Sequence, residues 1–475
     1  MTGNFRGYRA ALFLGFSFVA GLVFLAGCSV GPNYKRPDVD VPTAYRGLPE
    51  DQAAANAAAS LADEKWWDVF QDQELQGLIR TALKNNYDLR IAATRVVEAR
   101  AQLGITRADQ FPTLSGSGSI ASVRGAAEGP IPAYEVTQGT ASATAAWDLD
   151  FWGKYRRATE EQRAKLLAQQ WAQQEVAATL VANVASGYFQ LRELDLELEI
   201  AKRTYSSRTE SLKLTSELTD QGIDTMLDQR QAEQLVYTAG AQIPDLERQI
   251  GQQENALSVL LGNNPGSIPR GLKLTEQPNA PEVPAGIPSA LLERRPDIRE
   301  AEANLIAANA QIGVARAAYF PDISLTGTAG FESPALTKLF SGPAGIWTLA
   351  GGLTQPIFEG GRLRSNVRLA EAQRQEMVLT YQQTIQGSFR DVSNALIAYQ
   401  KTREFRIQEE RLTASARDAA DLSETRFKAG VADYLEVLTN ETNLFSDELT
   451  LAQAQLNELQ ALVQIYQALG GGWQQ

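Results

Sequence analysis

The sequence of 475 residues contains no histidine and only one cysteine, Cys28. Histidine is the most frequent general base and metal ligand in proteins, so its absence removes the commonest basis for a catalytic or zinc site. A single cysteine also excludes an internal disulfide framework and any Cys/His metal site. Pairs of carboxylates are plentiful, but the solvated faces of charged helices explain them more simply. We therefore expect no enzyme activity, no catalytic residues, no metal and no cofactor.

Long apolar runs are also missing after the first 28 residues. A membrane-spanning helix needs about 20 predominantly apolar residues, so any later crossing of a membrane must use strands. The net charge of -12 makes nucleic acid an unfavourable partner.

The N-terminus has the pattern of a secretory signal peptide. Arg6 and Arg9 precede an apolar run that ends in Leu-Ala-Gly-Cys at Cys28. This ending resembles the lipobox of bacterial lipoproteins, in which the cysteine is lipidated and becomes the new N-terminus. We predict a signal peptide over residues 1–27 and lipidation of Cys28; the alternative is an ordinary signal peptide with an incidental buried cysteine. Ser29, rather than aspartate, implies sorting to the outer membrane.

The rest of the chain is a duplication. Residues 101–112 read AQLGITRADQFP and residues 310–321 read AQIGVARAAYFP. Proline lacks a backbone donor and biases the preceding residue toward extended geometry, so Pro112 and Pro321 are expected to end helices. The segments that follow alternate small polar and apolar residues, which is the period of a strand. Each half of the chain is therefore predicted to run from helix to strands and back to helix.

Helices and strands are expected at equivalent positions in both halves. The first half should contain a helix over 72–110, strands over 112–124 and 134–149, a long helix over 153–222 and a return helix over 225–261. The second half should contain a helix over 288–319, strands over 321–331 and 346–358, a long helix over 361–428 and a last helix ending at 469. From Gly153 and Gly361 onward the two halves align with a constant offset of 208.

This pattern gives the predicted domain organisation. Residues 28–71 form an extended arm, 72–262 a first repeat, 263–287 a linker, 288–470 a second repeat and 471–475 a tail. Trp66, Trp67 and Phe70 are expected to anchor the arm by burial, with ligand stacking as the alternative. The aromatic cluster at the end of the second strand fits either a membrane interface or core packing: Trp147, Phe151, Trp152 and Tyr155.

The dimensions of these elements predict an assembly. At 1.5 Å per residue each long helix extends to roughly 100 Å, which no compact globule requires. Four strands per chain cannot close on themselves, because the smallest membrane barrels have eight strands and open edges are not tolerated in lipid. Several chains must therefore share one barrel. Membrane strands joined to long helices that pack side by side describe a conduit.

Several motifs together are similar to those of outer-membrane efflux lipoproteins of the OprM/NodT type, relatives of TolC. They are the lipobox, SVGPNYKRPDV, WWDVF, the block from NNYDLRIAATRVVEARAQLG to FPTLSGSGS, GLTQPIFEGGRLRSNV and QIYQALGGGW. The resemblance implies a homotrimer with a twelve-stranded β-barrel in the outer membrane and a helical tunnel in the periplasm. It also implies three partners: a periplasmic adaptor protein, an inner-membrane proton-driven pump of the resistance-nodulation-division class, and outer-membrane lipid.

The resemblance also implies where function is located. In this family the two helical turns form the periplasmic tip where the adaptor docks and where the resting tunnel is closed; here these turns hold Gly222, Ile223, Gly430 and Val431. Leu435 matches an apolar ring of that closure. The aspartate and arginine positions of the family's charged latch fall on Thr439 and Thr442. Arg426 matches a family position near the gate and is expected to pair with an acid.

An acidic ring at this tip would have to come from other carboxylates. The candidates are Asp224, Asp228, Asp433 and Glu436. The alternative for these four residues is the ordinary preference for negative charge at helix N-termini.

The predicted function is a passive exit duct that carries small molecules such as drugs or toxic compounds from the pump to the outside. One alternative is the outer-membrane duct of a type I secretion system, which shares the fold but not the partner. The other is a structural coiled-coil lipoprotein that never spans the membrane.

Overall fold

A computed structural model describes residues 29–46, 60–127, 129–130, 132–278 and 288–473. Cys28 and the predicted signal peptide therefore lie outside the described residues. Two compact units are present, and each draws on both repeats. The first comprises Met1–Asp38, Arg95–Gln169 and Ala301–Tyr381, and the second comprises Val39–Thr94, Gln170–Glu300 and Gln382–Gln475. Within the described ranges, no helix has both the length and the apolar character needed to span a membrane.

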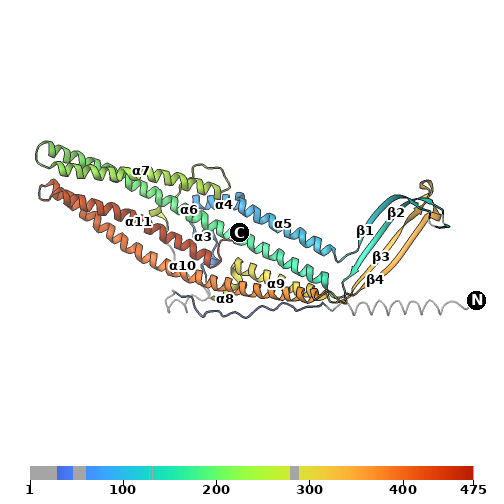
Figure 1. Cartoon of the computed structure of the whole chain (residues 1–475). Coiled ribbons are helices and arrows are strands. Elements are labelled where there is room, and N and C mark those ends of the chain that lie inside the picture. The colour runs from blue at the N-terminus through green and yellow to red at the C-terminus, as the bar shows by residue number, and fades with distance from the viewer. Residues whose placement is uncertain (1–28, 47–59, 128, 131, 279–287, 474–475) are drawn as a thin grey trace, which may run out of the picture. The chain divides into compact units, whose positions relative to one another are not determined.

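The helices and strands confirm the duplication (Figure 1). The first copy contains α4 (Gln73–Asn85), α5 (Tyr87–Ala108), β1 (Thr113–Gly125), β2 (Tyr134–Leu149), α6 (Lys154–Asp220) and α7 (Met226–Leu260). The second copy contains α8 (Pro288–Arg294), α9 (Pro296–Ala317), β3 (Asp322–Ser333), β4 (Gly345–Thr354), α10 (Arg362–Lys428) and α11 (Tyr434–Ala468). The long helices α6 and α10 each have 67 residues, and the return helices α7 and α11 each have 35.

The structure corrects the helices predicted over 72–110 and 288–319, because each is broken into two. The first break is at Asn86, whose Oδ1 accepts from the Leu89 N–H (3.0 Å) and whose Nδ2 donates to the Leu260 carbonyl (2.9 Å). The second break is at the equivalent Arg295, whose Nη1 donates to the Ala468 carbonyl (3.1 Å) before Pro296 starts α9. Apolar periodicity passes through both breaks, so the sequence pattern alone predicted one helix.

The four strands form one antiparallel sheet in the order β1-β2-β3-β4. Three of them match the predicted ranges within two residues, whereas β4 ends at Thr354 and not at residue 358. Pro356 explains the early end, because proline has no N–H for the ladder. Within the described chain, β1 and β4 each pair on one side only, so both outer edges of the sheet are open.

The register gives this sheet one polar and one apolar face. On the polar face, hydroxyls of neighbouring strands are hydrogen-bonded in the pairs Ser117–Ser142 (3.1 Å), Ser119–Thr140 (2.8 Å) and Thr144–Thr328 (3.1 Å). Side chains alternate between faces along a strand, so the residues between these lie on the other face. That face carries Leu114, Ile120, Ala143, Trp147, Leu325, Phe331, Trp347, Leu349 and Leu353.

The aromatic cluster after β2 divides between the two interpretations left open by the sequence. Trp147 lies on the apolar face and is 40% exposed, as expected at a membrane interface. Trp152 is instead packed within the first unit: its ring stacks on Phe320 at 4.7 Å, and its Nε1 donates to the Pro321 carbonyl (2.9 Å). Core packing is thus observed for Trp152, while the membrane-interface interpretation stays a prediction for Trp147.

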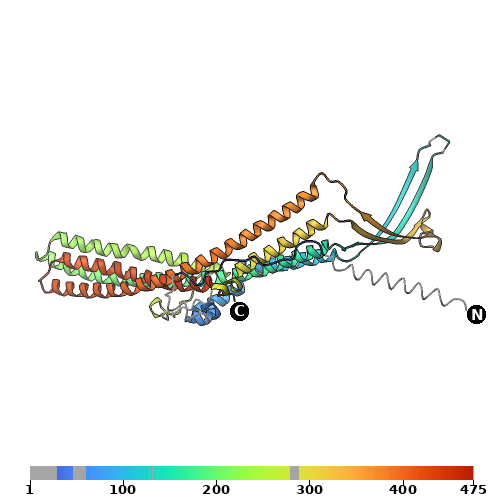
Figure 2. The same ribbon diagram turned by 90° about the horizontal axis from the view of Figure 1, so that it is seen from below.

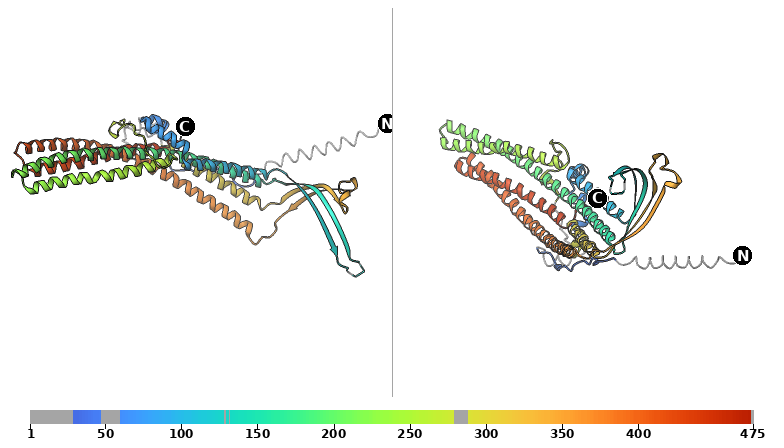
Figure 3. Two further views of the ribbon diagram at one scale, coloured as in Figure 1. Left: turned by 90° about the horizontal axis from the view of Figure 1, so that it is seen from above. Right: turned by 45° about the vertical axis from the view of Figure 1, so that its right-hand side comes forward.

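In the second unit, α6 returns as α7 and α10 returns as α11, so two helical hairpins end at the same end of the unit (Figures 1 and 2). The same arrangement is visible from two further sides in Figure 3. The hairpins share a core that includes Leu194, Leu246 and Phe445. The short helix α3 (Trp66–Val69) lies near the end of the predicted arm, so this part of the arm is helical and not extended. Trp66 and Phe70 are buried and Trp67 is partly buried, which agrees with anchoring by burial.

Candidate gate and docking site at the helical turns

The turn between α6 and α7 is built on Gly222. Its φ of 74° is in the left-handed region, which glycine adopts without steric cost. Its N–H donates to the Thr219 carbonyl (2.9 Å), and the Ile223 N–H donates to the Leu218 carbonyl (2.9 Å). These two bonds form a Schellman motif that satisfies the carbonyls at the end of α6.

The turn between α10 and α11 repeats this geometry at Gly430, with a φ of 70°. The Gly430 and Val431 N–H groups donate to the Phe427 (2.8 Å) and Arg426 (3.0 Å) carbonyls. A Cβ added at either glycine would meet no atom within 4 Å. Both positions therefore require glycine for its backbone conformation and not for lack of space.

Apolar side chains around both turns face water in the single chain. Ile223 is 66% exposed and Leu227 is 64% exposed; their counterparts Val431 and Leu435 are 67% and 54% exposed. Met226 adds a further exposed side chain at 57%. An apolar cluster of this kind at one end of a protein marks a contact surface.

Two of the candidate acids cap helices. Asp228 and Thr225 form a capping box at the start of α7, in which each side chain accepts from the backbone N–H of the other residue. Asp433 caps α11 by accepting from the Glu436 N–H (3.2 Å). The ordinary role of acids at helix N-termini therefore accounts for the positions of Asp228 and Asp433.

The other two acids differ from these. Glu436 forms an ion pair with Arg426, with 3.1 Å between its Oε1 and the arginine Nε, as the sequence comparison led us to expect. Asp224 has a buried Oδ2 with no hydrogen-bond partner in the described part of the chain. Burial raises the pKa of the Asp224 carboxyl, and the nearby Asp228 charge raises it further. Of the four carboxylates at the tip, Asp224 is thus the one whose negative charge is least compensated by hydrogen bonds or a neighbouring positive charge.

The two threonines at the latch positions bond to their own helix. The Thr439 hydroxyl donates to the Leu435 carbonyl (2.8 Å), and the Thr442 hydroxyl donates to the Leu438 carbonyl (2.7 Å). Threonine in a helix commonly makes this bond to the residue four positions earlier. Neither hydroxyl forms a link to another helix in the described residues.

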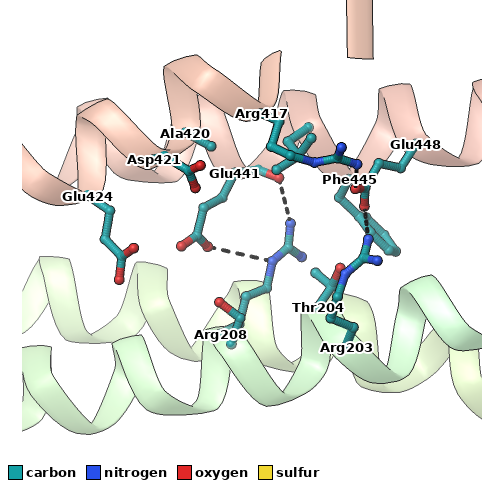
Figure 4. Close-up of a pocket in the computed structure, with 12 residues that line it drawn as sticks. Arg203, Thr204, Arg208, Arg417, Ala420, Asp421, Glu424, Glu441, Phe445 and Glu448 are labelled. Atoms are coloured by element: carbon teal, nitrogen blue, oxygen red, sulfur yellow. Dashed lines mark hydrogen bonds and ion pairs between the residues drawn. The ribbon is translucent and has the colours of Figure 1, made fainter. Parts of the chain in front are cut away.

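Sequence reasoning missed a buried arginine below the tip, shown in Figure 4. Arg208 of α6 is only 2% exposed, and it donates to the Leu235 carbonyl of α7 (3.1 Å) and the Glu441 carbonyl of α11 (3.3 Å). Its Nε lies 3.8 Å from the Glu441 carboxylate. Burial raises the pKa of Glu441, while the Arg208 charge lowers it. One side chain therefore joins the two hairpins.

A second ionic link lies beside it. Glu448 of α11 is buried between Arg203 of α6 and Arg417 of α10, with 2.7 Å to Arg417. These groups line a cavity of about 470 Å³ that also contains Arg208, Glu441, Phe445, Asp421 and Glu424. The signal that could have found them is a break in the repeat: at the offset of 208, Arg208 aligns with Ala416 and Glu448 with Gly240.

No group of three or more potential metal-ligating side chains is assembled within the described ranges. The site is thus a pair of capped turns with an apolar surface above and buried ion pairs below. Such an arrangement offers an apolar surface that a partner protein can bind, and apolar side chains that can close an opening.

Comparisons with known proteins agree with this interpretation. The chain is 37% identical to the probable efflux pump outer membrane protein TtgC of Pseudomonas putida, over 94% of this chain and 93% of that protein. It is 35% identical to the cation efflux system protein CusC of Escherichia coli K12, over 94% and 97%.

Solved structures give the same result. A crystal structure of CusC matches with a TM-score of 0.85 and 33% identity, over 94% of this chain and all of that chain. The open state of the Neisseria gonorrhoeae MtrE outer membrane channel matches with a TM-score of 0.86 and 31% identity, over 94% and 99%. The family model described as outer membrane efflux protein matches residues 78–263 and 287–471. The chain belongs to the outer membrane efflux protein family.

Proposed function

We propose that three copies of this chain form the exit duct of a tripartite efflux system. As a member of its family the chain is an outer-membrane efflux protein, and a periplasmic adaptor and an inner-membrane pump of the resistance-nodulation-division class would deliver the cargo. Lipidation of Cys28 would add an anchor. The observation that carries the proposal is the sheet, which combines one polar face, one apolar face and two open edges.

The open edges favour a trimer. Unpaired backbone groups are too costly in lipid to remain exposed, so β1 of one copy would pair with β4 of the next. Three four-stranded sheets joined in this way give twelve strands, an even number within the range of outer-membrane barrels. The apolar face would then contact lipid and the hydroxyl-rich face would line the lumen.

The helical turns would dock the adaptor and hold the gate. Gly222, Ile223, Gly430 and Val431 would form the docking tips. Three-fold symmetry would bring three copies of Leu435 around one axis, and a ring of leucines closes a narrow pore by dewetting. Asp224, Asp228, Asp433 and Glu436 would surround this ring, with Arg426 paired to Glu436 as in the single chain.

The duct is expected to carry cargo without selecting it closely. Relatives that align with nearly the whole of this chain at similar identity are named for efflux of different compounds: toluene, antibiotics and cations. Such different cargoes share no recognition chemistry, which supports selection by the pump and not by the duct.

Conductance in planar bilayers tests both the duct and its gate. Replacing Leu435 with Ser should raise the conductance of the purified trimer and admit vancomycin-sized molecules into cells, because a polar ring no longer dewets. Leu227→Ser, the repeat counterpart, and Thr439→Ala are matched controls that should change conductance little. A larger effect at Thr439 would argue against an apolar gate, and the absence of any channel in both the wild type and the Leu435 variant would refute the duct itself.

A further inference from the structure

The lipid-facing side of β4 continues beyond the end of the strand. Trp347, Leu349 and Leu353 on its apolar face are 79%, 76% and 67% exposed. After β4 ends, Ile357 and Phe358 are 96% and 88% exposed. An apolar strip thus extends from the strand to the start of α10, where the membrane portion meets the periplasmic helices.

Arginines follow this strip at once. Arg362 is the first residue of α10 and pairs with Glu359 (2.5 Å). Arg364 and Arg368 come next, are exposed, and form no ion pair within the described residues. Their spacing of four places both on one side of the helix. Two uncompensated guanidinium groups therefore lie directly beyond an apolar surface.

The same side of α10 carries Glu371, three residues after Arg368. Glu371 forms an ion pair with Arg316 of α9 at 2.8 Å. This pair joins α10 to α9. Arg364 and Arg368 lie on the same side of α10 as Glu371, so they face the same way as the side of α9 that holds Arg316.

Arg316 belongs to the stripe of α9 that binds the N-terminal arm. Glu302, Asn309 and Arg316 are spaced seven residues apart and so lie on nearly the same side of the helix. Glu302 accepts from the Arg36 guanidinium (2.7 Å), and Asn309 Nδ2 donates to the Pro32 carbonyl (2.9 Å). The arm follows Cys28 in the sequence, so the proposed lipid anchor would make this the outer side of the helical wall.

We propose that Arg364 and Arg368 bind the phosphate of anionic phospholipids in the periplasmic leaflet of the outer membrane, while Ile357 and Phe358 contact the acyl chains. The planar guanidinium donates paired hydrogen bonds that match phosphate oxygens. By the rise of a helix, the two residues lie about 3 Å and 9 Å beyond the first residue of α10. The headgroup layer is roughly 5–8 Å thick, so Arg364 lies within it and the long side chain of Arg368 reaches back to it from just outside.

The first repeat does not contain this site. The residues equivalent to Arg364 and Arg368 are Arg156 and Glu160. Arg156 is already bound to Asp150, and Glu160 accepts from Arg157 at 2.7 Å. One lipid site per chain, and three per assembly, therefore follows. The inference rests on the proposed membrane-inserted trimer.

The test uses the full-length trimer with the variant Arg364→Gln/Arg368→Gln. Trimers are placed in vesicles of phosphatidylethanolamine alone or with added phosphatidylglycerol, and thermal dissociation and co-purified lipid are measured. Each basic residue near an anionic surface contributes about five-fold in binding, so the variant should retain phosphatidylglycerol roughly 30-fold less well. Arg403→Gln/Arg411→Gln, which removes two exposed arginines further along α10, should behave as the wild type.

Equal retention of phosphatidylglycerol by the wild type and the Arg364/Arg368 variant would overturn the site. Equal stabilisation of the wild type by both vesicle types would also overturn the site, since apolar contact with any lipid would then explain the stabilisation. Both outcomes presuppose trimers that are inserted in the vesicles. A protein that forms no channel in either vesicle even when Leu435 is replaced by Ser would instead refute the proposed function, so the two failures are distinguishable.

Discussion

The two helical hairpins have the same backbone but different side chains at equivalent positions. α6/α7 and α10/α11 match in length, and both turns use glycine with the same pair of capping bonds. At the first residue of the return helix, however, Met226 is 57% exposed whereas Tyr434 is 3% exposed and packs its ring on Phe427 at 5.5 Å. Duplication has preserved the geometry of the tip while its packing diverged.

The polar links between and within the hairpins have diverged as well. Arg208 of the first hairpin aligns with Ala416 of the second, and Arg426 of the second aligns with Leu218 of the first. The first hairpin therefore reaches across to its neighbour through a buried arginine, while the second is tied internally by the Arg426–Glu436 pair. The comparison indicates that the α6 link holds the hairpins together. The α10/α11 tip also packs on the first hairpin, because Tyr434 lies in one apolar cluster with Ala232 of α7.

The largest effect is expected from Arg208→Met. Removing one partner of a buried ion pair leaves Glu441 uncompensated, which costs about 3–5 kcal/mol of stability. Chemical denaturation of the trimer measures the loss. The double variant Arg208→Met/Glu441→Gln should recover part of it, and Arg403→Met on the exposed surface of α10 should cost almost nothing. A small loss in the single variant, or no recovery in the double variant, would contradict the role assigned to Arg208.

Substitution of the turn glycines should have the next largest effect. A β-branched residue in the left-handed conformation costs about 1–2 kcal/mol, so Gly222→Val/Gly430→Val should displace both tips while the trimer stays assembled. Crosslinking to the adaptor and drug efflux should fall together. Asn tolerates this conformation better, which makes Gly222→Asn/Gly430→Asn the control. Unchanged crosslinking and efflux in the valine variant would remove these turns as docking tips.

The smallest effect is expected at the surface ion pairs, and it sharpens the comparison between hairpins. Arg426→Gln breaks the pair with Glu436, and Arg230→Gln breaks the pair with Glu233 (2.6 Å) in the first hairpin. Exposed pairs contribute about 0–1 kcal/mol, so both variants should keep near-normal stability. Only Arg426→Gln should increase the open time in bilayer recordings, more so at low salt. Equal changes in both variants would mean that the second tip has no special role in closure.

Much of the architecture was readable from the sequence because it depends on local patterns. The Phe-Pro pairs at Pro112 and Pro321 ended helices, alternation predicted strands, and the constant offset of 208 placed both turns. The breaks at Asn86 and Arg295 were not predicted, since each depends on a carbonyl far along the chain, Leu260 or Ala468.

The candidate site was predicted less completely. The turn glycines follow from local rules of helix ends, and the Arg426 pair from a resemblance. The buried link at Arg208 requires three helices to meet, and neither charge nor periodicity in one segment encodes that meeting. The only indication of this link in the sequence is that Arg208 aligns with Ala416 in the second repeat.

The hydroxyl pairs on the polar face of the sheet have a consequence for transport. Ser117 pairs with Ser142 and Ser119 pairs with Thr140 across the strands, so one of the two O–H donors in each pair is already engaged before any solute arrives. In the proposed duct, the wall would be wettable yet offer a passing molecule fewer free donors than the same hydroxyls would if they were unpaired. Cargo would bind the wall only weakly and leave it quickly, which suits a duct whose role is to release what the cell expels.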